Sequence, residues 1–330
     1  MGGTGVSVIS YRDAVTRALA DELAGDESVI LIGEDVGAAG GVFKATAGLF
    51  DRFGRDRVRD TPISEQAIVG CALGAAVTGL RPVGEIMFAD FAGVCFDQIA
   101  NQLAKYRYQS GGQRGVPATL RMASGGGVGF GAQHSQCVEN WFLNIPGIKL
   151  CLPATPADAY TLLRAAIRDD DPVIVFEHKA LYPRTGELGD PRSALPIGRA
   201  AVVRTGNDIT VVAAQLMLHR ALEAAEALAA EGISCEVIDP RSIAPLDVAT
   251  VLRSLERTGR LACVQESPAA GSWGQAVVAE CVAGGFELLD APPLVVAADP
   301  VPVPYAESLE DATLPNVDRI VRELRGLAGA

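Results

Sequence analysis

The sequence predicts an α/β protein with two domains, each a mainly parallel sheet flanked by helices. Short runs rich in β-branched residues alternate with longer stretches of 3.6-residue periodicity, which is typical of strand–helix–strand crossover units. A segment rich in Pro, Gly and charge, residues 182–193, interrupts this alternation, and the pattern restarts beyond it. The 330 residues are enough for two hydrophobic cores.

The pattern predicts helices and strands in turn along a first domain, residues 8–185. Apolar residues at helical spacing predict helices at 11–24, 65–78, 90–108 and 155–168. Continuous apolar runs predict buried strands at 29–33, 82–86, 118–122 and 172–176. After a linker at 186–204, a second domain at 205–330 begins. It is expected to hold strands at 209–213, 235–238 and 261–265 and helices at 217–230 and 247–257.

Composition excludes several classes of function. A net charge of -12 without a basic cluster argues against nucleic acid or an anionic membrane as partner, and 5% aromatic residues argue against base stacking. The longest apolar stretches, such as 68–77, are short and interrupted by Gly, and the N-terminus lacks a secretory pattern. We therefore expect a cytoplasmic protein. Its seven cysteines, with no Cys-x-x-Cys pair, are expected to be buried thiols rather than disulfides or zinc ligands.

The segment around Glu65 is the first candidate site. Ser64 is placed to cap the helix that begins at Glu65, and a carboxylate in a first helical turn is favoured by the helix dipole. On these grounds alone Glu65 is a plain capping acid. However, Gly70, Gly74 and Gly79 along the same helix predict close packing at a buried interface. A carboxylate buried there needs a proton-bearing partner.

A glycine-rich segment, residues 123–136, is the second candidate. Five glycines allow positive φ and close approach of a ligand to the backbone, although neither dinucleotide-binding nor phosphate-loop spacing is present. His134 follows them, directly before an expected helix. A lone His is usually structural, but this context favours a site. His178 is expected at a strand end and His219 on an exposed helix start. Without i, i+4 pairs or a Gly-x-Ser-x-Gly motif, zinc and serine-hydrolase sites are disfavoured.

Six motifs occur in one order along the chain: Ile-Gly-Glu-Asp-Val at 32–36, Asp-Thr-Pro-Ile-Ser-Glu at 60–65, Gly-Leu-Arg-Pro at 79–82, Glu-Ile-Met-Phe-Ala-Asp at 85–90, Gly-Ala-Gln-His-Ser-Gln at 131–136 and Cys-Glu-Val-Ile-Asp-Pro-Arg-Ser at 235–242. With them the chain resembles the beta subunit of the thiamine-diphosphate-dependent decarboxylase component of 2-oxo acid dehydrogenase complexes. That family includes pyruvate, branched-chain and acetoin dehydrogenase beta subunits. The resemblance implies a transketolase-like pyrimidine-binding domain followed by a transketolase C-terminal domain.

The resemblance also implies roles for individual residues. Glu65 would be the catalytic carboxylate that bonds N1′ of the aminopyrimidine, and His134 would lie near the reacting substrate. The cofactor would contact Glu34, Ile63, Glu65, Met87 and Phe91, with the Phe91 ring stacked on the pyrimidine. A structural potassium ion would be held by Ala118, Ala166, Ile167, Asp169 and Asp171. From the residues alone, the acidic run at 169–171 is either a solvated turn or a cation site.

A partner is implied by a missing motif. Enzymes of this type hold Mg²⁺ on the diphosphate with a Gly-Asp-Gly segment, and the chain contains none. The resemblance therefore implies an alpha subunit that binds Mg²⁺ and shares thiamine diphosphate, in an alpha-two beta-two heterotetramer. A lipoyl acyltransferase core is the further partner it implies.

The implied reaction forms a hydroxyethyl-thiamine intermediate from pyruvate or acetoin and passes the acetyl unit to lipoamide. Met87 and Phe91 resemble the residues that pyruvate-type subunits carry in the apolar slot for the pyrimidine. Residues 176–182 resemble the corresponding segment of acetoin-type subunits. Two enzymatic alternatives remain open: a branched-chain 2-oxo acid dehydrogenase beta subunit, and half of a stand-alone thiamine-dependent acyl or ketol transferase with a small acceptor. A non-catalytic scaffold is disfavoured by the intact segments around Glu65 and His134.

Overall fold

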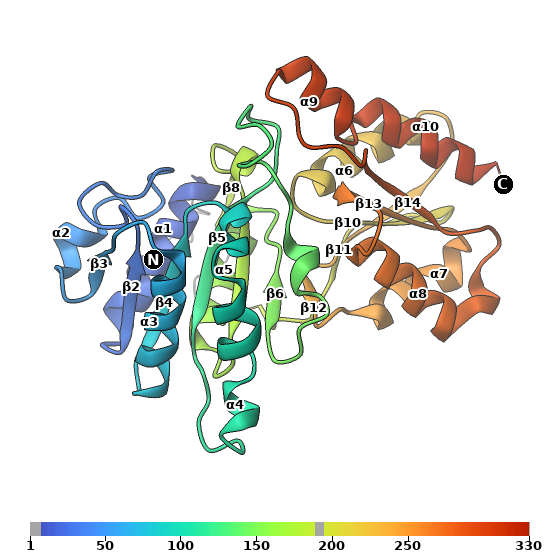
Figure 1. The fold of residues 1–330 in the computed structure, drawn as a ribbon. Helices are drawn as coiled ribbons and strands as arrows, with labels where there is room; N and C mark the ends of the chain where they lie inside the picture. The colour runs from blue at the N-terminus through green and yellow to red at the C-terminus, as the bar shows by residue number, and fades with distance from the viewer. Residues whose placement is uncertain (1–7, 189–194, 330) are drawn as a thin grey trace, which may run out of the picture. The chain divides into compact units, whose positions relative to one another are not determined.

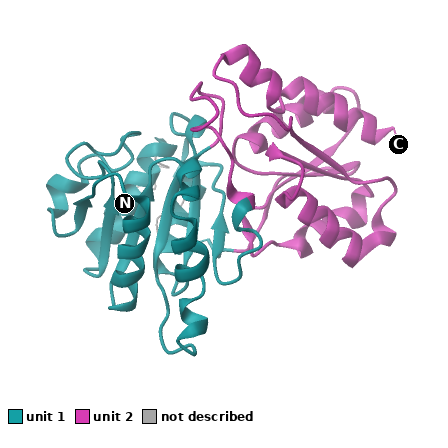
Figure 2. Cartoon of the chain, viewed as in Figure 1, with its two compact units in different colours: residues 1–124, 141–197 teal, residues 125–140, 198–330 magenta. Residues whose placement is uncertain are grey.

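The computed structural model describes residues 8–188 and 195–329, which divide into two compact units (Figure 2). Unit 1 comprises residues 1–124 and 141–197, and unit 2 comprises residues 125–140 and 198–330. The glycine-rich segment therefore belongs with the C-terminal part of the chain. Of the expected linker, residues 189–194 lie outside the described residues.

Unit 1 is built on a parallel sheet in the order β6-β7-β5-β4-β2-β3 (Figure 1). Its strands are β2 (Val29–Gly33), β3 (Val58–Asp60), β4 (Arg81–Ile86), β5 (Thr119–Ser124), β6 (Lys149–Cys151) and β7 (Val173–His178). All residues of β2, β5 and β7 are buried, as expected for strands covered on both faces. A short antiparallel pair, β1 (Val8–Ser10) with β8 (Thr185–Glu187), completes the unit.

Helices cover this sheet. Helix α1 (Tyr11–Gly25) packs against α5 (Pro156–Arg168), and α3 (Glu65–Val77) packs against β4 and the π-helix η2 (Gln98–Leu103). The oxygens of Ser10 and Thr155 cap α1 and α5 by accepting hydrogen bonds from backbone amides. The smaller helical elements are α2 (Leu49–Phe53), α4 (Tyr106–Gln109), η1 (Ala89–Gly93), η3 (Glu139–Phe142, in both units) and η4 (Lys179–Leu181).

The single helix predicted at 90–108 is wrong. The segment is divided into η1, η2 and α4, with a different backbone hydrogen-bond pattern in each. The amide of Ala104 reaches the carbonyl of Ile99, five residues back, instead of the carbonyl four residues back. Gly93, a poor helix former, ends η1. Apolar spacing predicted the buried face correctly but could not reveal these changes of hydrogen bonding.

Unit 2 contains a sheet in the order β14-β13-β10-β11-β9, in which β9 alone runs antiparallel. Its strands are β9 (Ala201–Arg204), β10 (Ile209–Ala213), β11 (Cys235–Asp239), β13 (Leu261–Pro268) and β14 (Leu294–Ala298); β12 (Ser242–Ala244) follows β11 in sequence. Helices α6 (Gln215–Ala229) and α10 (Val317–Ala328) cover one face, and α7 (Val248–Thr258) and α8 (Trp273–Gly285) cover the other (Figure 1). The turn η5 (Phe286–Leu288) and helix α9 (Glu307–Thr313) complete it.

Two sequence expectations about burial are wrong. Cys71 is exposed on the outer face of α3, while five other cysteines are buried and Cys137 is half-buried. His219, expected on an exposed helix start, is 7% exposed because the first turn of α6 packs on its own sheet.

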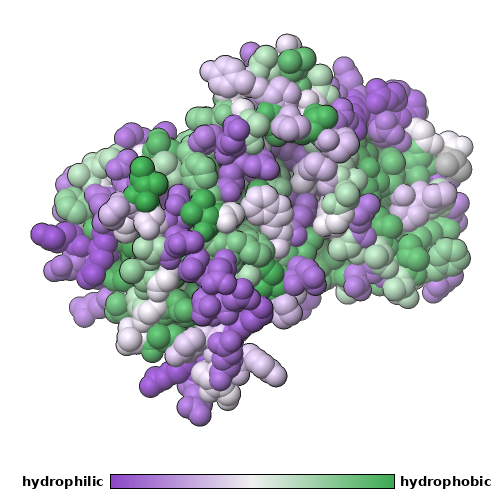
Figure 3. All heavy atoms as spheres, viewed as in Figure 1, coloured by the Kyte–Doolittle hydropathy of each residue, from purple (hydrophilic) through white to green (hydrophobic). Residues whose placement is uncertain are grey.

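Hydrophobic and hydrophilic residues are interspersed over the face seen in Figure 3. Among the described residues, no helix has the length and apolar character needed to cross a membrane.

Candidate active site

Glu65 is the first residue of α3 and is buried. Its side chain is 8% exposed, and within the described ranges 8–188 and 195–329 no hydrogen-bond donor or basic group pairs with its carboxylate. Ser64 occupies the N-cap position but makes no capping hydrogen bond, so the expected cap is wrong. A buried carboxylate without a donor is costly, which makes Glu65 suited to a ligand that presents a proton.

Two other ionisable groups lie close to Glu65. Partial burial, then the charges of Asp35 and Glu65, raise the pKa of Glu34 at the end of β2. Burial, followed by the charge of Glu65, raises the pKa of Cys95 to about 12. Since no basic group in the described part of the chain pairs with Glu65, the site favours a cationic or proton-donating ligand.

The residues expected to surround the cofactor follow neighbouring strands. Gly33 of β2 pairs with Asp60 of β3 on one side and with Glu85 of β4 on the other, so the carboxyl ends of the three strands are aligned. Glu34, Ile63 and Met87 follow these three ends in the chain. The carboxyl edge of a parallel sheet is where α/β proteins bind ligands.

Two apolar side chains at this edge are half-buried, Met87 and Phe91. The Phe91 ring packs edge-on against Phe88 with centroids 5.8 Å apart, and Phe88 packs in the same way against Phe43 at 5.6 Å. Ile63, expected to help form the slot, is 77% exposed in this chain. At this edge the chain therefore presents half-buried Phe91 and Met87, while Ile63 is exposed to solvent.

The glycines of α3 are not required by packing within this chain. A Cβ atom built at Gly70 or Gly74 meets no atom within 4 Å, so the expected close approach is absent from the described residues. Gly79 lies beyond the helix and has a φ of 106°, which explains a glycine there by backbone conformation.

A buried ion network lies on the strands that carry this edge. The Arg121 guanidinium on β5 donates to Glu177 on β7 at 2.7 and 2.8 Å and to Glu85 on β4 at 2.6 Å. The Tyr182 hydroxyl donates to Glu177 at 2.8 Å. Burial raises the pKa of Glu85, while Arg121 opposes that shift. The network holds three neighbouring strands together near their carboxyl ends.

Residues 125–136 of the glycine-rich segment lie in unit 2, and three of their amides donate to carboxylates of the same unit. Glu310 on α9 accepts hydrogen bonds from the amides of Gly127 and Gly129, and Glu266 on β13 accepts one from Gly126. Carboxylates of the chain therefore occupy three of the backbone amides that were expected to be open to a ligand. Nor does a helix follow His134 directly, since the next helical turn begins only at Glu139.

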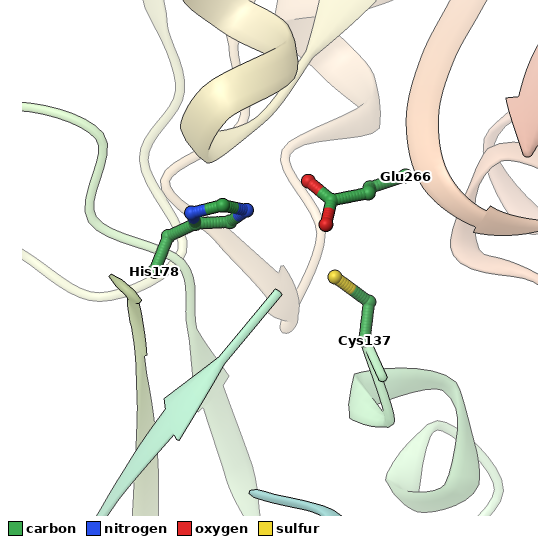
Figure 4. Close-up of side chains that lie close together, drawn as sticks. All are labelled: Cys137, His178 and Glu266. Atoms are coloured by element: carbon green, nitrogen blue, oxygen red, sulfur yellow. The ribbon is translucent and has the colours of Figure 1, made fainter. Parts of the chain in front are cut away.

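A second group of buried and half-buried side chains lies just beyond His134. The Cys137 sulfur and the Glu266 carboxylate approach within 4.8 Å (Figure 4). Burial, together with the charge of Glu266, raises the pKa of Glu139 to about 7. Asn140 donates to Ser267 at 2.7 Å and accepts from the Trp273 amide at 2.9 Å. His178 ends β7 in unit 1, as predicted.

The acidic run at 169–171 is paired with the chain's own basic residues. Lys149 lies 2.6 Å from Asp169, Arg81 lies 2.7 Å from Asp170, and Arg107 pairs with Asp171. Arg81 also donates to the carbonyls of Ile167 and Asp169 at 3.2 and 3.0 Å. The carbonyls of Ala118 and Ala166 accept amide hydrogen bonds from Val173 and Asp169. The acidic run, for which a solvated turn and a cation site were both open, thus forms ion pairs with the chain's own basic residues, and the side chain of Asp170 is 74% exposed.

Comparisons with known proteins agree with this architecture. Residues 7–185 match the transketolase pyrimidine-binding domain, and residues 198–320 match the transketolase C-terminal domain. The chain is 46% identical to the acetoin:2,6-dichlorophenolindophenol oxidoreductase subunit beta of Bacillus subtilis (strain 168), over 98% of both chains. It is 45% identical to the mitochondrial pyruvate dehydrogenase E1 component subunit beta-2 of Oryza sativa subsp. japonica, over 95% of this chain and 85% of the relative. The chain belongs to the E1 beta-subunit family of acetoin and 2-oxo acid dehydrogenases.

Two further relatives extend the comparison. The 2-oxoisovalerate dehydrogenase subunit beta of Bacillus subtilis (strain 168) is 44% identical over 98% of this chain and 99% of its own. A solved split-gene transketolase, described as an inactive beta4 tetramer, superposes with a TM-score of 0.80 at 24% identity, covering 97% of this chain and 98% of its own, and shows the shared fold. Members of the E1 beta-subunit family act with thiamine diphosphate.

Several residues of this beta subunit were not singled out from its sequence. The sequence did not indicate Glu266 and Glu310, because they contact the glycine-rich segment only through the fold and belong to no motif. It did not indicate Glu139 either, whose burial and proximity to Glu266 are also set by the fold. Arg121 could have been found, since a charged residue in the middle of an apolar strand indicates a buried ion pair.

Proposed function

We propose that this beta subunit forms, with an alpha subunit, a thiamine-diphosphate-dependent dehydrogenase that acts on pyruvate or acetoin. The observation that carries the proposal is Glu65, a buried carboxylate beside the carboxyl ends of β2, β3 and β4 for which the described residues provide no donor. Its place in the Asp-Thr-Pro-Ile-Ser-Glu segment corresponds to the catalytic carboxylate implied by the family resemblance.

Glu65 would hold the aminopyrimidine of thiamine diphosphate through a proton shared between its carboxylate and the ring nitrogen. When bound, thiamine diphosphate supplies the carbon nucleophile that attacks the substrate carbonyl. Met87 and Phe91 offer an apolar surface to the pyrimidine ring, and Glu34 adds negative charge beside Glu65. His134, half-buried in unit 2, donates or accepts a proton near the substrate carbonyl or the acyl acceptor.

The alpha subunit completes the site in this proposal. No Gly-Asp-Gly segment occurs in the chain, so the Mg²⁺ and the diphosphate are held by the partner. Gly70 and Gly74 on the exposed face of α3 leave room for the backbone of another chain. We expect an alpha-two beta-two heterotetramer that passes the acyl group to a lipoyl domain of an acyltransferase core.

The substrate is proposed from the residues of the slot. Relatives named for acetoin, pyruvate and 2-oxoisovalerate are 46%, 45% and 44% identical to this chain, too close to separate the three. The pair Met87 and Phe91 resembles the pyruvate-type slot, which favours formation of a two-carbon acyl group.

A substrate panel tests the proposal. The chain is co-expressed with its alpha subunit, and thiamine-dependent dye reduction is measured with pyruvate, acetoin, 2-oxobutyrate and 3-methyl-2-oxobutanoate. We expect activity with pyruvate or acetoin that exceeds activity with the branched acid. A preference for the branched acid would overturn the substrate assignment. Tight cofactor binding without dye reduction would instead favour a transferase with a small acceptor.

A further inference from the structure

The glycine-rich segment of unit 2 has a regular backbone. Gly125, Gly127, Gly129 and Gly131, every second residue, have positive φ values of 86°, 81°, 70° and 75°. Successive backbone amides of such turn conformations can converge and form a concave site for an anion. In this segment the anions are carboxylates supplied by the chain itself.

Glu310 makes the most specific of these contacts. Its two carboxylate oxygens each accept one amide, from Gly127 at 2.8 Å and from Gly129 at 3.0 Å. The residue is 3% exposed, and a Cβ at Gly126 would lie 3.0 Å from its carboxylate oxygen. Glu266 supplies the second anchor at the amide of Gly126.

The anchored segment leads directly to His134. The amide of His134 donates to the carbonyl of Gly131 at 3.2 Å, so the conformation of that glycine sets the backbone position of the histidine. Tyr305 of the same unit lies beside Gly131, with its ring 3.7 Å from a Cβ built there. The contacts of Glu310 and Tyr305 thus fix the segment on the way to His134.

We propose that Glu310 is a positioning residue for the reaction: its carboxylate holds the glycine-rich segment in the one conformation that presents His134 to the substrate. The inference rests on the proposed function, in which His134 acts near the substrate. A carboxylate is required because it offers an acceptor at both oxygens. A glutamine of the same shape would turn an N–H₂ donor toward one of the two amides and leave that amide without a partner.

Glu310→Gln in the assembled alpha–beta complex tests this proposal, with Glu307→Gln as the matched control. Glu307 is on the same helix and exposed. For Glu310→Gln we expect kcat to fall about tenfold or more, with substrate KM and thiamine diphosphate affinity within about twofold of wild type. Amide hydrogen exchange should accelerate in residues 126–134 and remain unchanged in α3. Glu307→Gln should match wild type throughout.

A second variant keeps the test decisive if Glu310→Gln does not assemble. Gly129→Ala leaves Glu310 intact but places a side chain on a residue with a φ of 70°. The substitution therefore disturbs the backbone of the segment directly and should lower kcat similarly. Wild-type kcat in either folded variant would overturn the proposal, as would faster exchange without a change in kcat. If the wild-type complex itself is inactive with every substrate, the proposed function fails. In that case, amide hydrogen exchange of residues 126–134 that is unchanged in Glu310→Gln would separately overturn the claim that Glu310 holds the segment.

Discussion

Arg121 lies between two carboxylates that belong to the strands on either side of its own. Its side chain is 2% exposed, as is that of Glu177, whereas that of Glu85 is 12% exposed. Removing water from three charged groups is costly, and their mutual hydrogen bonds, with the one that Tyr182 donates to Glu177, offset that cost. The ion network therefore depends on all of its members.

Arg121→Met should lower the free energy of unfolding by about 3–5 kcal/mol, because two carboxylates remain buried without their cation. Urea denaturation measures the loss. Arg55→Met, which removes an exposed arginine of the same unit, is the control and should change the free energy by less than about 0.5 kcal/mol. A loss for Arg121→Met as small as that of the control would show that the network does not stabilise the fold.

Glu139 makes stability depend on pH. Burial raises its pKa from 4.5 to about 7, so the folded chain keeps a proton that the unfolded chain releases. Its contribution to stability is therefore full below about pH 4.5 and is lost as the pH rises through 7. Glu139→Gln should show a smaller fall in the free energy of unfolding between pH 5 and pH 8 than wild type does.

Urea denaturation at intervals of one pH unit checks this difference. Glu226→Gln, an exposed glutamate of α6, should retain the wild-type slope. An unchanged slope in Glu139→Gln would mean that Glu139 is ionised in the folded protein at pH 5.

At the scale of elements, periodicity predicted the strands and helices that bury a continuous apolar face. Strand β10 was predicted with its observed bounds, and α3 differs from its prediction by one residue. Short edge strands such as β3 and β9 were missed, because three or four residues carry too little pattern. The prediction of one helix at 90–108 was wrong for a different reason. The spacing of apolar residues over so few turns does not distinguish π and 3₁₀ turns from an α-helix.

Gly147, just before β6, shows how backbone conformation constrains the connection between elements. Its φ is 96°, and a Cβ atom there would overlap the carbonyl oxygen of Ala104 at the end of η2. Gly147→Ala should lower the free energy of unfolding by at least about 3 kcal/mol, from left-handed strain and the clash together.

Gly111→Ala separates the two causes. Gly111 has a φ of 65° and no atom within 4 Å of a built Cβ, so this substitution introduces strain alone. It should cost about 1–2 kcal/mol in the same denaturation experiment. Equal losses in the two variants would show that the carbonyl of Ala104 moves aside freely.

At the scale of the whole molecule, the division of the chain is less simple than two consecutive domains. Residues 125–140 cluster with residues 198–330, because carboxylates 140 to 183 positions later hold the glycine-rich segment. The motif around Glu65 was recognisable because its residues are consecutive. Glu266 and Glu310, which hold the glycine-rich segment before His134, were not recognisable from the sequence. Contacts between distant residues leave no local pattern in a single sequence.

The central claim is that Glu65 activates thiamine diphosphate in a site completed by an alpha subunit. Glu65→Gln in the alpha–beta complex tests this claim most directly, with Glu27→Gln, an exposed glutamate of unit 1, as control. Thiamine-dependent dye reduction is measured with pyruvate and acetoin. We expect Glu65→Gln to lose at least about 100-fold in kcat, because the neutral amide cannot take up the proton. Full activity in Glu65→Gln, or full activity of wild-type chain without its partner, would contradict the claim.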